Sequence, residues 1–283
     1  MKKIFAFLLM LFAVATVKAQ EEVQLSDDQI IKVTEPVGFL HNQGLDYIYE
    51  QLRSSYGEVF PPTKPKEGRP KLYSILDGAT LSFAKSTFNS DELDHSRFIN
   101  GDMTGLIATH AEVPLADLFK VADPEHKLSG EFYEAVTALD GLMQDVDRNQ
   151  MRCAYDELVK EKIGTLKSYD EKLAWGSAVS IAYHSLAYWE KNRDKWQNFF
   201  GSGSKTATAR KPAKDIAKAD VAGIVTGGIS GCAYGAVGGT VTMPGIGTVA
   251  GCAGGAAVGA VAGGLGSSAK KAAEAFVDWL FGD

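Results

Sequence analysis

The sequence lacks the residue groupings that most catalytic and metal-binding sites require. Its three cysteines and five histidines are scattered, and no two cysteines have the spacing of a zinc site. It contains no HExxH motif, no P-loop and no serine in a GxSxG context. We therefore expect a protein that is not an enzyme, with no catalytic residues, no metal site, no cofactor and no small-molecule substrate.

The sequence also lacks an excess of basic residues and any sustained strand pattern. Its 29 Lys and Arg against 35 Asp and Glu give a net charge of −6, which argues against general nucleic-acid binding. No segment alternates apolar and polar residues as a half-buried strand does. Since 45% of the residues are hydrophobic, a sizeable core can form, and we expect helices to build it.

The first residues have the parts of a secretory signal peptide. Two lysines precede an apolar run over residues 4–17, and small residues lead up to Ala19. The run is too short to cross a membrane comfortably as an anchor. We expect residues 1–19 to be removed on export to the periplasm, cell envelope or extracellular space, and residues 20–35 to form a flexible tail.

Residues 36–200 predict an all-α domain of six or seven helices. Apolar residues recur there at helical spacing, and the first helix is expected to follow Pro36 and to stop at Gly57. The last helix carries an aromatic stripe, which we interpret as a core face. An aromatic belt at a membrane interface is the alternative. The stripe comprises Tyr183, Tyr188, Trp189, Trp196, Phe199 and Phe200.

A basic Gly/Ser linker over residues 201–220 is expected to separate this domain from a glycine-rich segment. Residues 221–269 contain no charged side chain over 49 consecutive positions. Within them glycine recurs every fourth residue in two series, which a flexible linker does not need, so we interpret each series as one face of a helix. The series are Gly223, Gly227, Gly231, Gly235, Gly239 and Gly247, Gly251, Gly255, Gly259, Gly263.

The two series predict a glycine-zipper helical hairpin over residues 221–266. Pro244 and Gly245 lie between them and are turn residues, and the series are mirror images about position 243. Folding at the turn sets the two glycine faces against each other, as in small-residue pairs of membrane helices. A short amphipathic helix over residues 267–283 is expected to follow.

The hairpin would bring the two cysteines of the segment to nearly the same level. Cys232 and Cys252 lie 11 and 9 residues from position 243, an offset of about 3 Å along a helix. Close packing through glycine would place them within disulfide range. Two small buried thiols are the alternative.

The surroundings in which such a hairpin is stable are restricted. Each glycine costs a helix about 1 kcal/mol in water relative to alanine, so the helices need a packing partner or a bilayer. Each arm is long enough to span a bilayer, but its many small residues make it only mildly hydrophobic. Lysines flank both ends, which the hairpin would bring to one side, where they would meet anionic head groups. They are Lys214, Lys218, Lys270 and Lys271.

The segment resembles the glycine-zipper peptides of class II, two-peptide-type bacteriocins, and the glycine-zipper domains of bacterial envelope proteins. The matching sequences are GGISGCAYGAVGG and PGIGTVAGCAGGAAVG, with proline-glycine between the zipper halves and a cysteine in each. The resemblance implies helix association in membranes and permeabilisation. This chain differs from that family in its export signal and in the helical region that precedes the segment.

Together these features favour an exported protein that associates with membrane lipid, or with copies of itself, through its glycine faces. The alternative is a secreted structural or binding protein whose hairpin packs on its own helical domain. The two hypotheses differ in whether the glycine faces function in lipid or in water.

Overall fold

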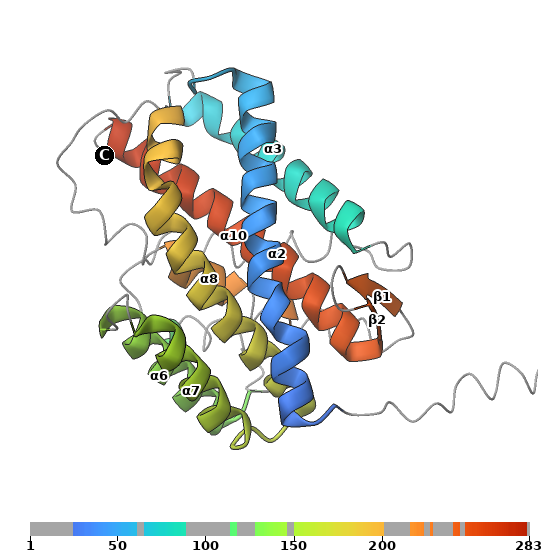
Figure 1. Cartoon of the computed structure of the whole chain (residues 1–283). Helices are drawn as coiled ribbons and strands as arrows, with labels where there is room; N and C mark the ends of the chain where they lie inside the picture. Colours follow the sequence, from blue (N-terminus) through green and yellow to red (C-terminus); the bar gives the residue numbers. More distant parts are fainter. Residues whose placement is uncertain are drawn as a thin grey trace, which may run out of the picture.

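The structure is a computed structural model of the chain (Figure 1). It describes residues 25–60, 65–88, 114–117, 128–145, 150–200, 216–223, 227–228, 240–243 and 247–281. The fold is all-α, as predicted from the sequence, and the described part also includes one short β-hairpin. The predicted signal peptide lies outside the described residues.

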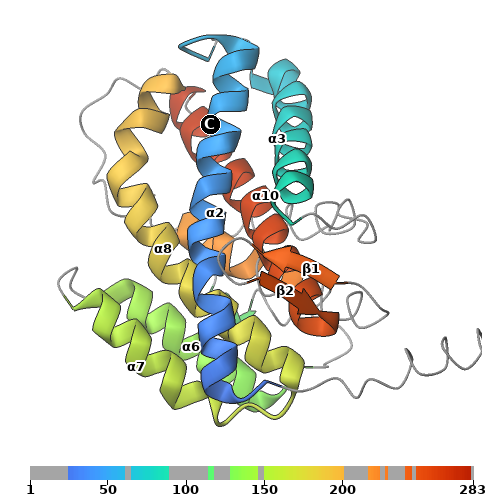
Figure 2. The same ribbon diagram turned by 45° about the vertical axis from the view of Figure 1, so that its right-hand side comes forward.

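A bundle of long helices makes up the fold, and α10 crosses its middle. In Figures 1 and 2, α10 passes behind α2 and α8, and it packs against α2, α3 and α8. Helices α6 and α7 pack on one end of α8. The elements are α2 (Asp27–Tyr56), α3 (Pro65–Thr87), α6 (Gly130–Asp145), α7 (Met151–Ile163), α8 (Tyr169–Phe199), β1 (Thr240–Met243), β2 (Gly247–Ala250) and α10 (Gly251–Phe281).

Helix α2 begins well before Pro36, so the predicted flexible tail is wrong from Asp27 onward. Ser26 and Gln29 form a capping box in which the Ser26 N–H donates to the Gln29 side chain at 2.9 Å and the Gln29 N–H donates to the Ser26 hydroxyl at 3.4 Å. The helix ends as predicted at Gly57, whose φ of 86° suits glycine. The cap therefore starts α2, and the proline lies inside it.

Helix α8 compensates for the proline inside α2. The Ser180 hydroxyl donates to the Glu35 carbonyl at 2.6 Å and accepts from the Gly38 N–H at 3.1 Å, so one side chain bonds the backbone on both sides of Pro36. A Cβ atom on Gly38 would lie only 2.5 Å from the Ser180 carbonyl oxygen. The glycine is therefore what lets the two helices approach this closely.

A single buried carboxylate caps two helices at the base of the bundle. Glu171 accepts from the Ser168 N–H within the capping box that starts α8. The same carboxylate accepts from the N–H of Ser129 at 2.6 Å and from its hydroxyl at 3.1 Å. Ser129 in turn accepts from the Phe132 N–H at the start of α6. Glu171 thus fixes the start of α8 against the start of α6.

The aromatic stripe of α8 faces the core, as predicted, and not a membrane interface. Trp189, Trp196, Phe199 and Phe200 are each at most 1% exposed. They pack edge-on or tilted against one another and against Tyr49 of α2, with ring centroids 5.0 to 5.7 Å apart for the pairs in closest contact. This cluster joins the C-terminal halves of α2 and α8.

The C-terminal part differs from the predicted helical hairpin. Residues 240–243 and 247–250 form antiparallel strands, where we expected the inner ends of two helices. β-branched Thr and Val dominate these eight positions, and they favour strand over helix. Helix α10 then continues to Phe281, so the predicted arm and amphipathic helix are one element. The predicted linker also ends early, because residues 216–223 are helical and all but Lys218 are buried.

Replacing Glu171 with alanine should destabilise the bundle by about 2 kcal/mol, because it leaves a partly buried N–H of Ser129 without its acceptor and removes one cap of α8. Urea unfolding followed by circular dichroism measures the change. Glu161→Ala is the control, since Glu161 lies on α7 with 65% of its side chain exposed and pairs only with its neighbour Lys162. It should change stability by no more than about 0.5 kcal/mol. Equal effects of the two substitutions would contradict the assigned capping role.

Candidate functional site

The predicted glycine faces meet where residues 216–223 and 227–228, which are helical, lie along α10. A Cβ atom on Gly227 would overlap the carbonyl of Gly259 and lie 3.3 Å from the Cα atom of Gly263. A Cβ atom on Gly223 or on Gly263 would overlap the carbonyl oxygen of the other. The two backbones therefore touch at these positions, and no side chain larger than a hydrogen atom fits between them.

The other predicted packing residues have different positions. Gly255 is buried within α10, Gly251 is its first residue, and Gly247 lies in β2, so Gly247 belongs to a strand and not to a helix face. Strand pairing places Met243 opposite Gly247. Outside the described residues lie Gly231, Gly235, Gly239 and the predicted turn residues Pro244 and Gly245.

Cysteine pairing stays a prediction. Cys232 lies outside the described residues, so the expected Cys232–Cys252 bond falls there too. Among the described side chains no disulfide is seen, and Cys153 is a free, exposed thiol on α7. Its pKa is raised, chiefly by a hydrogen bond to Glu157, which keeps it in the less reactive protonated form.

The middle of α10 is buried on all sides. Every residue from 254 to 269 is buried, which is the pattern of a helix surrounded on all sides. A second glycine makes room for it on α2: a Cβ atom on Gly44 would lie 2.6 Å from a methyl group of Leu265. In this structure α10, the main described part of the glycine-rich segment, thus lies inside the helical bundle.

A buried polar cluster joins the glycine-rich segment to α2 and α8. We define it as His41 of α2, Ser185 of α8, Asp220 and Ser268 of α10, all of which are 0% exposed. The Ser185 hydroxyl donates to the Asp220 carboxyl group, and the His41 Nε2 atom lies 3.7 Å from the same carboxyl group. Four segments far apart in sequence therefore meet at one polar point in an apolar core.

Burial has opposite effects on the two titratable groups of this cluster. It lowers the pKa of His41 from 6.5 to about 4, which favours neutral imidazole. It raises the pKa of Asp220 from 3.8 to about 7, although the nearby hydroxyls of Ser185 and Ser268 oppose the shift. Between these values the folded pair holds one proton, carried by Asp220, and has no net charge.

Two ion pairs hold the ends of the buried part of the segment. Lys218 pairs with Asp140 of α6 at 2.7 Å, and both side chains are nearly buried. Lys270 pairs with Asp77 of α3 at 2.7 Å. Of the four lysines expected to flank the hairpin, these two bind carboxylates of the bundle, and Lys214 lies outside the described residues. In this state Lys218 and Lys270 are not available to lipid head groups.

The buried polar cluster is unsuited to catalysis in this state. Its members include a serine, a histidine and an aspartate, but the aspartate binds the serine, and the histidine has no contact with that serine in the described hydrogen bonds. Because all of them are fully buried, no substrate can reach them. Within the described ranges, no three His, Cys, Asp or Glu side chains come together as metal ligands.

Sequence reasoning missed this cluster. Neither His41 nor Asp220 stands out in the sequence, because the contact joins residues 179 positions apart. The available signal was the position of Asp220 itself, directly before 49 uncharged residues. An acid at the edge of a buried segment needs a partner in the core.

Comparison with protein-family models, with curated proteins and with solved structures finds no match in any of the three. Among the helices as described, none is long and apolar enough to cross a membrane.

The glycine contact predicts a sharp contrast between two glycines of α10. Gly263→Ala should destabilise the protein by about 3 kcal/mol, because its Cβ atom would meet the backbone of residue 223. Gly266→Ala should be neutral or stabilise the protein by up to about 1 kcal/mol, because a Cβ atom there meets nothing within 4 Å. Urea unfolding measures both. Similar effects of the two substitutions would show that the backbones do not touch.

The buried polar cluster predicts opposite pH dependences for two single variants. Because folding lowers the pKa of His41, the contribution of His41 to the stability of the folded state falls as pH drops from 6.5 to about 4. Because folding raises the pKa of Asp220, the contribution of Asp220 falls as pH rises from 3.8 to about 7. In the native protein these slopes offset each other. Relative to it, Asp220→Asn should lose about 1 kcal/mol per pH unit as pH falls from about 7 to 3.8, and His41→Gln a similar amount as pH rises from about 4 to 6.5.

Urea midpoints at pH 4.5, 5.5 and 6.5 give these differences, and comparison with the native protein removes the contributions of all other titrating groups. Differences that stay constant across this range would contradict a pair that shares one proton.

Proposed function

We propose that this chain is an exported, non-enzymatic helical protein that associates with membranes through its glycine-rich segment, and that the bundle stores this segment before that encounter. The observation that carries the proposal is the direct backbone contact of residues 223 and 227 with residues 259 and 263 in an uncharged segment. The resemblance of the segment to glycine-zipper bacteriocins and envelope domains agrees with this assignment.

The contact between glycines suits lipid as well as water. Backbones that touch are held by close packing, which does not require water to drive apolar side chains together. The same pair of segments can therefore stay together when the surrounding helices are exchanged for lipid chains. Since no described helix is apolar enough to cross a membrane, we propose association as a packed pair and not as single spanning helices.

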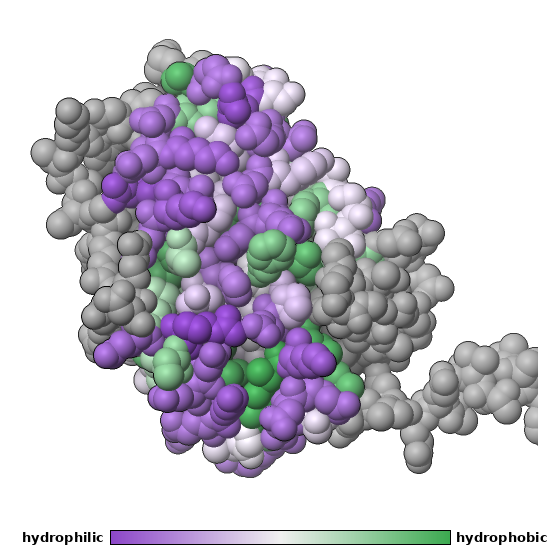
Figure 3. All heavy atoms as spheres, viewed as in Figure 1, coloured by the Kyte–Doolittle hydropathy of each residue, from purple (hydrophilic) through white to green (hydrophobic). Residues whose placement is uncertain are grey.

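The outer helices are suited to cover the segment in water. Figure 3 shows a mainly hydrophilic surface on the side where α2, α7 and α8 lie. Behind that surface the segment is held partly by polar links: the buried polar cluster and the ion pairs of Lys218 and Lys270. Buried polar contacts stabilise an interface less than apolar packing of the same size, so these links favour a segment that can separate from the bundle.

The second candidate is a secreted structural or binding protein in which the segment stays in place. Complete burial of residues 254–269 favours it, because exposing that surface to water is costly. The two candidates make opposite predictions for variants that loosen the ends of the segment.

Breaking both terminal ion pairs should increase membrane association. The double variant Asp77→Asn and Asp140→Asn leaves the segment unchanged and frees Lys218 and Lys270 for lipid phosphates. We expect its binding to phosphatidylglycerol-rich vesicles to rise about tenfold over the native protein, measured by co-sedimentation, with leakage of an enclosed dye as a second readout.

The control is Asp27→Asn with Asp46→Asn. It changes the charge equally and breaks two ion pairs, with Lys172 and Lys195, that do not involve α10. It should bind vesicles no more than the native protein does. If the first double variant is folded and binds no vesicles, the membrane proposal is wrong and the permanently packed alternative stands.

A further inference from the structure

Helix α3 is attached to the bundle on one side only. Among the described elements it packs chiefly on α2 and α10, whereas α2 and α8 also pack on α7 and form with each other the most extensive helix pair of the fold. Figures 1 and 2 show α3 at the margin of the bundle, away from α6 and α7. The other described helices therefore keep most of their packing partners when α3 is displaced.

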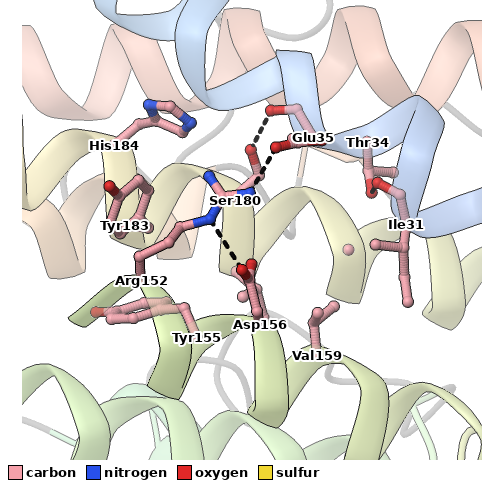
Figure 4. A pocket seen from close by; sticks show the side chains of 12 residues that line it. Ile31, Thr34, Glu35, Arg152, Tyr155, Asp156, Val159, Ser180, Tyr183 and His184 are labelled. Atoms are coloured by element: carbon pink, nitrogen blue, oxygen red, sulfur yellow. Dashed lines mark hydrogen bonds and ion pairs between the residues drawn. The ribbon is translucent and has the colours of Figure 1, made fainter. Parts of the chain in front are cut away.

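The helices that would remain are joined by a contact that does not involve α3. Arg152 of α7 pairs with Glu35 of α2 at 2.6 Å, and its guanidinium lies 5.2 Å from the ring centroid of Tyr183 of α8, so one cation joins three helices (Figure 4). The same three helices line a small pocket, and no residue of α3 lines it. The junction of α2, α7 and α8 is thus independent of α3.

Polar links at the edge of α3 join it to its two neighbours. Asp77 of α3 pairs with Lys270 of α10 at 2.7 Å, and 36% of the Asp77 side chain is exposed. The Tyr47 hydroxyl of α2 lies 3.1 Å from the Ser82 hydroxyl in an exposed contact, and its ring centroid is 5.9 Å from that of Phe83. Solvent weakens such links, so α3 is held mainly by its few buried apolar side chains. From residue 71 onward these are Leu72, Leu76, Ala79, Phe83 and Ala84.

The surface beneath α3 has the chemistry of an anionic-lipid contact. Displacing α3 exposes one side of α10, in which residues 254–269 are uncharged and buried. It also separates Lys270, directly after that stretch, from Asp77. The Tyr47 ring of α2 loses its contact with Phe83 and borders the same surface. An uncharged stretch bordered by a lysine and a tyrosine suits the interface of a membrane that carries anionic head groups.

We propose that α3 is a cover that opens before the rest of the bundle and exposes the adjoining surface of α10 and α2 to anionic lipid. This inference rests on the proposed function, because it names the surface through which the stored segment first meets a membrane. The ion pair between Asp77 and Lys270 is then an autoinhibitory contact, which keeps that surface covered in water.

Amide hydrogen exchange of the full-length mature protein, measured without vesicles, tests the order of opening. A detached single helix frays in water, so α3 exchanges its amide protons whenever it is displaced, whereas the packed helices stay protected. We expect the amides of residues 72–87 to exchange at least about tenfold faster than those of α2, α8 and α10.

Two glycines that face open space provide a matched pair of variants. Gly78 lies on α3 and Gly141 on α6, and a Cβ atom at either position meets nothing within 4 Å. Because alanine favours helix over glycine, Gly78→Ala should slow the exchange of α3 about fivefold and weaken co-sedimentation with phosphatidylglycerol-rich vesicles by a similar factor. Gly141→Ala should change neither quantity. Since Gly78→Ala is expected to stabilise its helix, loss of folding cannot produce this result.

Two aliphatic variants should act in the opposite direction. Leu76 of α3 and Ile163 of α7 are at most 3% exposed, and alanine at either position removes three carbon atoms. Leu76→Ala should speed the exchange of α3 and raise vesicle binding, each at least about tenfold. Ile163→Ala should speed the exchange of α7 and leave vesicle binding at the native level.

Two results would each overturn the inference and leave the membrane proposal standing. One is an exchange of α3 no faster than that of α2, α8 and α10. The other is vesicle binding that responds to Gly141→Ala and Ile163→Ala as strongly as to Gly78→Ala and Leu76→Ala. Absence of vesicle binding in every variant, including the double variant of the terminal ion pairs, would instead overturn the proposed function and the lipid partner inferred here. The exchange rates would then still decide whether α3 opens first.

Discussion

Backbone contact between the segment that begins at residue 216 and α10 is the constraint on which the rest of the bundle depends. Where Gly227 meets Gly259 and Gly223 meets Gly263, no Cβ atom fits. This spacing determines where Asp220 and Ser268 lie, and therefore which atoms of α2 and α8 can reach them. Gly44 of α2 makes a similar contact with α10: because Gly44 has no side chain, the Leu265 side chain of α10 can pack directly against the α2 backbone.

Polar contacts fix the register of helices whose glycine faces alone would not fix it. Smooth helix faces can slide along one another, because they have few knobs to fix their register. The buried polar cluster and the ion pairs of Lys218 and Lys270 each have one position of good geometry. They fix the register of the segment near residues 218–220 and 268–270. Close packing and fixed register thus come from different residues, and only the polar links respond to protonation.

Local patterns in the sequence predicted what depends on local physics. The helical class, the stop at Gly57 and the inward aromatic stripe of α8 follow from spacing and turn chemistry. The start of α2 was predicted too late because Pro36 was weighted above the capping box at Ser26. The strands at residues 240–243 and 247–250 were not predicted, because the glycine period was weighted above the β-branched residues at these positions. The buried polar cluster and the pocket join distant segments, and a single sequence offers little information on such contacts.

The order of the helices along the chain has a kinetic consequence. The central helix, α10, follows α2, α3 and α8 in the sequence, and the contact of His41 with Asp220 closes a loop of 179 residues. Contacts of this separation form late and slowly, since much chain entropy is lost before they are made. Helices α2 and α8 can pack on each other before then, but the faces of α2, α3 and α8 that α10 covers stay exposed until it is made. The fold is thus expected to be completed only after α10 has been synthesised.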